Sequence, residues 1–246
     1  MYLLNIQVAL IFELDEQIIF TLGERLKEAQ KKYIANLQLL NVPNGVPPEA
    51  PRLLFMASNF NLNISLNRVD IFITPPDQIK TNINACLNYA LTTINSLYNL
   101  LLKNVVKYNW CGIILNLNYP EKIQPSIKAM VKIAPYILKT DSKGREMASL
   151  NLQIGFKEPP YFKNITIFGY DQYQLAIPTP NVQNPNQDIQ NTPIEESGIT
   201  ILLDINNKPQ SDKNSFENDF SNLIKKIEIS YMSLLDELNL EGVINA

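Results

Sequence analysis

The chain has 246 residues, of which 46% are hydrophobic and 18% charged, so it can bury a substantial core and is not disordered as a whole. Its 21 basic and 24 acidic residues give a net charge of −3, which argues against a protein whose main task is to bind nucleic-acid phosphates. Histidine is absent, which removes the commonest general base and metal ligand from any proposed chemistry.

The first half begins with a predicted strand and a predicted helix. Alternating apolar residues predict a strand over Leu3 to Leu14, and a helical apolar stripe follows over Gln17 to Leu40. Asn41 to Pro51 carries four prolines and a glycine and is predicted to be a loop. A meander of three short strands comes next, at Leu53 to Met56, Asn61 to Leu66 and Val69 to Thr74.

The second half begins after a further helix, predicted at Gln78 to Lys103 and capped by Asp77. Its strands are predicted at Trp110 to Tyr119, Ala148 to Phe156, Ile165 to Tyr173 and Ile199 to Ile205. A short helix is expected from Pro125 to about Ala134, and Lys157 to Asn164 is expected to be a connection between two strands. The closing helix is predicted at Phe216 to Leu240.

This order of elements predicts an α+β fold, in which mainly antiparallel sheet is packed by three long amphipathic helices. We expect a single domain over residues 1–246, which can be divided into two similar-looking halves at about 1–104 and 105–246. A segment rich in proline, asparagine and glutamine, at about 177–197, is expected to be a mobile insertion.

The cysteine content and the N-terminus indicate a cytoplasmic protein. Cys86 and Cys111 are the two cysteines, and we expect both to be buried free thiols. The apolar N-terminus lacks the basic region and cleavage site of a signal peptide. No segment approaches the ~20 apolar residues that a membrane-spanning helix needs, so no membrane association is expected.

Five segments carry a resemblance to a known family. They are VALIFELD (Val8 to Asp15), PRLLF (Pro51 to Phe55), YNWCGIILNLNYP (Tyr108 to Pro120), LLDIN (Leu202 to Asn206) and the terminal helix from Phe216 to Leu240. In this pattern the chain resembles a sporadically distributed prokaryotic family of unknown function. The resemblance implies a shared architecture but no activity, cofactor or catalytic residue. The patchy distribution of that family suggests a context of mobile elements or phage defence.

Motifs for cofactor chemistry are missing from the sequence. Neither of the two glycine-rich phosphate-binding patterns occurs, and two cysteines without histidine do not supply a structural zinc set, so no cofactor or metal is expected. The alternative is a carboxylate-based hydrolase, with or without a metal, whose acids would have to converge in a pocket. The candidate acids are Glu13, Asp15, Asp70, Asp171 and Asp204.

Two further segments are candidates for contacts with a partner. A charged hairpin tip holds Lys139, Lys143 and Arg145, which are candidates for anion contact. Aromatic residues are enriched at interface cores, and a group of them around the last strands forms the candidate partner-binding patch: Tyr161, Phe162, Tyr170 and Tyr173. The sequence therefore favours a non-enzymatic interaction module or complex subunit that binds a protein partner or a second copy of itself, with nucleic acid disfavoured as a ligand.

Overall fold

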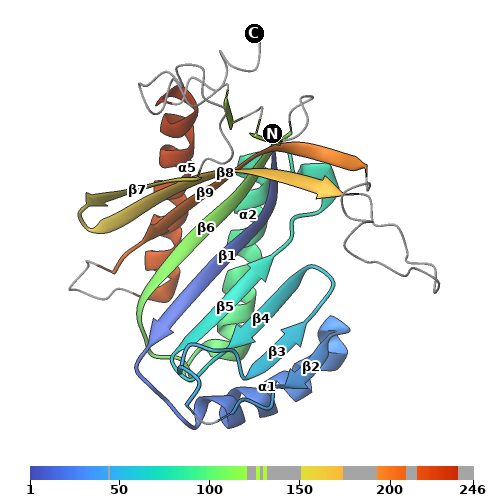
Figure 1. Ribbon diagram of the computed structural model, residues 1–246. Coiled ribbons are helices and arrows are strands. Elements are labelled where there is room, and N and C mark those ends of the chain that lie inside the picture. The colour runs from blue at the N-terminus through green and yellow to red at the C-terminus, as the bar shows by residue number, and fades with distance from the viewer. Residues whose placement is uncertain are drawn as a thin grey trace, which may run out of the picture.

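The computed structural model shows an α+β protein built on one nine-stranded antiparallel sheet (Figure 1). It describes residues 1–43, 45–120, 126–127, 130–131, 151–173, 193–208 and 215–237. The strand order is β2-β3-β4-β5-β1-β6-β9-β8-β7. The strands of the first half are β1 (Tyr2–Phe12), β2 (Asn36–Leu39), β3 (Leu53–Met56), β4 (Phe60–Ile64) and β5 (Arg68–Ile73). Those of the second half are β6 (Tyr108–Pro120), β7 (Asn151–Glu158), β8 (Tyr161–Tyr173) and β9 (Ile194–Asn206).

The two halves of the sheet repeat one arrangement. The first strand of each half lies beside the last strand of the same half, so that β1 pairs with β5 and β6 pairs with β9. β1 and β6 also pair with each other in antiparallel orientation, and they join the halves at the centre of the sheet. Short turns between neighbouring strands favour this sequential antiparallel order.

Three α-helices of the described chain pack on one face of the sheet: α1 (Ile18–Tyr33), α2 (Ile83–Leu97) and α5 (Phe216–Glu237). α2 contacts β1 and α5, while α5 contacts β6 and β9. Figure 1 shows α2 and α5 behind the sheet. α1 contacts β3 near one end of the sheet.

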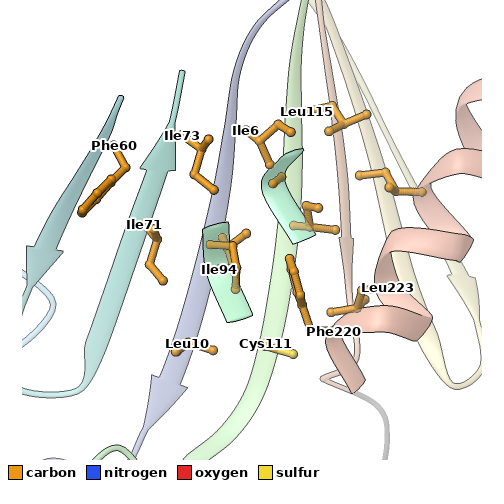
Figure 2. Close-up of a cluster of buried hydrophobic side chains, with 14 of the residues drawn as sticks. Ile6, Leu10, Phe60, Ile71, Ile73, Ile94, Cys111, Leu115, Phe220 and Leu223 are labelled. Carbon is orange, nitrogen blue, oxygen red and sulfur yellow. The ribbon is translucent and has the colours of Figure 1, made fainter. Parts of the chain in front are cut away.

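The core lies between this face and the helices. In β1, Ile6, Val8 and Leu10 are completely buried, because every second side chain of a strand points to the same face. Figure 2 shows the side chains of β4, β5, β1 and β6 directed toward Ile94 of α2 and Phe220 of α5. Their burial in one continuous cluster supplies the main driving force for folding.

The predicted helix over Gln17 to Leu40 is wrong in its last part. α1 ends at Tyr33, Ile34 adopts a left-handed conformation with φ 50°, and the chain turns back as strand β2. Pairing with β3 supplies backbone hydrogen bonds to β2 that outweigh a weak helical preference. Leu37 and Leu40 continue the helical spacing, whereas Leu37 and Leu39 have the spacing of a strand, so the apolar pattern was ambiguous here.

Other boundaries also differ from the predicted ones. α2 begins at Ile83 with Asn82 as its cap, whereas the predicted cap, Asp77, begins a short 3-10 turn, η1 (Asp77–Ile79). The C-terminal end of this helix widens into a π-helical turn, η2 (Tyr98–Leu102). β7 and β8 extend through most of the predicted connection over residues 157–164, and only the cis-linked Pro159 and Pro160 remain as the turn.

The expected insertion at about 177–197 overlaps a strand. β9 begins at Ile194, so the last residues of that range belong to the sheet, and residues 177–192 lie outside the described part of the chain. Of the short helix predicted over 125–134, the helical residues 126–127 and 130–131 are described.

Candidate functional site

The four aromatic residues of the predicted patch all lie on β8, but they do not gather at one place. Tyr161 begins the strand and Phe162 follows it, while Tyr170 lies eight residues beyond Phe162, which corresponds to about 27 Å at ~3.4 Å per residue. Tyr161 packs against the core, whereas Tyr173 is 44% exposed at the far end. The structure therefore does not bring these side chains together as one surface.

Tyr170 belongs to a polar network on the face of the sheet opposite the helices. Its hydroxyl donates to Oε1 of Glu196 at 2.6 Å, and the Tyr2 hydroxyl donates to the same oxygen at 2.7 Å. Asn118 donates to the Tyr2 hydroxyl at 3.3 Å and accepts from Thr200 at 2.9 Å. Burial and the nearby Glu196 carboxylate raise the pKa of the Tyr170 hydroxyl, which stays protonated and joins strands together.

Four of the five candidate acids have separate hydrogen-bond partners in the structure. Asp15 accepts a hydrogen bond from the Gln17 amide at the start of α1, while Glu13 is exposed. Asp70 forms a two-bond ion pair with Arg68, both bonds at 2.7 Å.

The other two candidate acids lie on the strands of the second half. Asp171 accepts from the backbone and hydroxyl of Ser126 and from the Ser197 hydroxyl. Burial raises the pKa of the Asp204 carboxyl, which accepts from Asn164 at 3.0 Å. Over the part of the chain that the structure describes, no three Cys, Asp or Glu side chains come close enough to hold a metal.

The remaining chemical candidates either lie outside the described residues or are buried. Lys139, Lys143 and Arg145 fall in the undescribed range 132–150. Cys86 and Cys111 are both free and buried, as expected. Burial raises the pKa of both thiols, so neither is activated as a nucleophile.

An apolar groove lies between α1 and the outer strand β2, which Figure 1 shows side by side at one end of the sheet. Its volume is about 460 Å³. The groove, defined by its lining, comprises Glu16, Ile19, Phe20, Gly23, Glu24, Lys27, Leu37, Leu39 and Leu53. A second hollow of about 490 Å³ shares Glu16, Ile19 and Leu39 and continues toward Val42 and Leu66.

Large apolar side chains at this groove are exposed to solvent. Phe20 is 71% exposed and Leu39 is 70% exposed, and both line the groove. Scattered single apolar residues are ordinary on a protein surface, but contiguous ones beside a groove are typical of a binding site.

The free edge of the sheet runs along the same groove. β2 is the terminal strand in the sheet order, so one side of its backbone has no neighbouring strand among the described residues. The Leu40 amide donates to the Arg52 carbonyl at 2.8 Å, which places the even-numbered residues of β2 in hydrogen bonds with β3. Because bonding alternates along an antiparallel strand, the N–H and C=O groups of Leu37 and Leu39 point to the open edge.

Sequence reasoning missed this groove because it depends on recognising β2. Residues 36–39 were assigned to the preceding helix, which hid the free edge. A signal was present in the alternation Asn36-Leu37-Gln38-Leu39, which is the period of a strand exposed on one face. Phe20 was a second signal, because it lies off the apolar stripe of the helix, whose buried residues are Ile18, Leu22, Leu26 and Ala29.

Comparisons with known proteins add no assignment to this geometry: no family model matches the chain, and no curated protein matches it in sequence. Within the described ranges, no helix is long and apolar enough to cross a membrane.

Proposed function

We propose that this protein is a non-enzymatic interaction module that binds an extended segment of a protein partner along β2. The observation that carries the proposal is the coincidence of a free strand edge and an apolar groove at the same end of the sheet. The incoming segment would pair with the backbone of Leu37 and Leu39 and place apolar side chains beside Phe20.

Strand addition explains why both features are needed together. Backbone pairing supplies affinity that does not depend on the partner's sequence, whereas a groove that accepts alternate side chains supplies specificity. Successive side chains of a strand point to opposite faces, so a bound strand directs every second residue toward the groove. The preferred partner is therefore a segment with apolar residues at alternate positions.

The expected setting of this module follows from the sequence alone. A cytoplasmic location and a role in a mobile-element or phage-defence complex are parts of the proposal that rest on the cysteine content and on the family resemblance described above. The free edge of β2 can accept one strand, which is consistent with a subunit of a complex in which the partner supplies that strand.

A random-peptide display library selected on the immobilised protein tests the proposal. We expect enriched peptides with apolar residues at alternate positions, and we expect Leu39→Arg to abolish their binding. Ile229→Arg is the matched control, because Ile229 is 64% exposed on α5, away from β2. Enriched peptides that bind the Leu39→Arg protein as well as the wild type would contradict the proposal.

A further inference from the structure

We propose that the partner at the β2 edge is a second copy of the same chain, bound about a two-fold axis through Gln38, so that the two sheets become continuous. This inference rests on the proposed function, because it names the occupant of the same edge. It is carried by the symmetry of the strand, by the charge pattern of α1 and by the position of Ile34.

The edge strand is complementary to itself. The sequence Leu37-Gln38-Leu39 reads the same in both directions, and its outward-facing backbone groups belong to the two leucines. Antiparallel pairing about Gln38 places Leu37 of one copy opposite Leu39 of the other, so that each leucine exchanges an N–H and a C=O bond with its partner. An isologous interface of this kind uses one surface twice and leaves no unpaired β2 edge in either copy.

The exposed strip of α1 is complementary to itself in charge. Phe20, Glu24, Lys27 and Lys31 recur every three or four residues and therefore follow one side of α1, and Glu16 continues the same spacing in the turn just before the helix. Glu16 lies two residues before the first turn of α1, which itself holds no acidic residue, and Lys31 and Lys32 lie in the last turn. A two-fold axis reverses the second helix, which brings Glu16 of one copy toward the basic last turn of the other copy's α1.

The positions of the charged residues along this strip identify which two would meet across the two-fold axis. The midpoint between Glu16 and Lys31 falls between Gly23 and Glu24, in the stretch of α1 that lines the groove beside Leu39. An axis near this point therefore brings Glu16 of each copy toward Lys31 of the other. Lys27 already contacts Glu24 of its own chain at 2.6 Å, so Lys31 is the better residue for a charge-reversal experiment.

The same register gives Ile34 a place to bind. Pairing about Gln38 brings the start of one β2, which Ile34 precedes, beside the end of the other β2, which Val42 follows, and Val42 lines the second hollow. Ile34 is 92% exposed and holds a left-handed backbone, a conformation that costs a β-branched residue about 1–2 kcal/mol. A contact across the interface supplies a reason for a large apolar side chain at this position.

Sedimentation equilibrium of the full chain tests this inference from about 1 to about 100 µM, the range of micromolar association. We expect a species of twice the 28.0 kDa monomer mass. Leu39→Arg should weaken association at least about tenfold, as expected for a central interface residue, whereas Ile229→Arg should leave it unchanged. Leu39 is 70% exposed, so its replacement is compatible with folding, which circular dichroism checks.

A charge-reversal pair separates a second copy from any other partner. Lys31→Glu alone should weaken the dimer, and more strongly at low salt, because it places like charges at the crossing. Adding Glu16→Lys to the same chain should restore association, since each copy then presents both reversed charges. A partner of different sequence would not be rescued by this double change.

Hydrogen exchange on the wild type gives a readout without substitution. The amides of Leu37 and Leu39 should exchange slowly in the dimer and faster on dilution. A wild-type protein that stays monomeric across the concentration range overturns the inference, as does a dimer that Leu39→Arg leaves intact. Either result leaves the proposed function open to its own test, because a displayed peptide can occupy the edge of a monomer.

Discussion

The hydroxyl of Tyr108 donates a hydrogen bond to Oδ2 of Asp219 at 2.9 Å, which ties the first residue of β6 to the first turn of α5. Both residues are buried, and Asn207 also approaches the same carboxylate oxygen at 3.4 Å. The Asn207 side chain accepts from the Cys111 amide at 2.8 Å, so the network continues into the sheet. This contact fixes the position of α5 over β6, because a buried carboxylate is stable only where donors surround it.

Tyr108→Phe should therefore destabilise the protein. It removes a donor from a buried carboxylate, and we expect the free energy of unfolding to fall by about 1–3 kcal/mol. Tyr33→Phe is the matched control, because the Tyr33 hydroxyl is buried and has no hydrogen-bond partner among the described residues. Urea titration of both variants measures the difference, and a Tyr108→Phe protein as stable as Tyr33→Phe would contradict this reading.

Gly198→Ala should destabilise the pairing of β6 with β9. A Cβ atom at Gly198 would overlap the Tyr119 carbonyl oxygen on the neighbouring strand, so the backbone would have to move. Strain of this kind typically costs about 1–3 kcal/mol. Thermal unfolding of Gly198→Ala measures the loss of stability.

Gly155→Ala serves as the control for that substitution. Its Cβ would lie 3.0 Å from the Asn164 side-chain oxygen, which can move aside because it is not part of the backbone. We expect little change, or a small gain from the lower flexibility of alanine in the unfolded chain. Equal losses of stability in the two variants would show that backbone overlap is not the cause.

Ile34→Gly should stabilise the isolated monomer. Glycine adopts the left-handed conformation that ends α1 without steric cost, so we expect a gain of about 1 kcal/mol in the free energy of unfolding. The measurement belongs at low protein concentration, where association does not contribute. A loss of stability there would mean that Ile34 makes contacts in the monomer that outweigh its backbone strain.

Asp204→Asn should stabilise the protein at pH 7 and have less effect near pH 3. Burial raises the pKa of the Asp204 carboxyl, so the folded state holds its proton at pH values where the unfolded state has released it. Stability from this group is fully present below the unfolded pKa of about 3.9 and is lost as the pH rises through the folded pKa. Urea titrations across this range measure the effect.

Glu158→Gln should change the pH dependence of stability in the direction opposite to that of Asp204→Asn. Lys226 and Lys163 contact the Glu158 carboxylate at 2.7 and 2.9 Å and lower its pKa. Its stabilisation is present above the unfolded pKa and is lost as the pH falls through the folded pKa. The variant should therefore be less stable at pH 7, by under about 1 kcal/mol because solvent screens this partly exposed group. If the two variants show the same pH dependence, burial and ion pairing do not explain these pKa values.

The sequence by itself determined the class of fold and most of its elements. Alternating apolar residues located β1 and β6, and the helical apolar stripes located the starts of α1 and α5, because each periodicity places one face in the core. The absence of histidine and of glycine-rich phosphate loops removed several kinds of chemistry, which is a property of composition alone.

Only the tertiary structure decided where the candidate site lies. Leu37 fits a helical spacing with Leu40 and a strand spacing with Leu39, and pairing with β3 selects the strand because it satisfies the backbone there. The groove exists because α1 and β2 lie side by side, and the four tyrosine and phenylalanine residues of β8 are separated because a strand spreads its residues along its length. Both results depend on contacts between segments, which local periodicity does not encode.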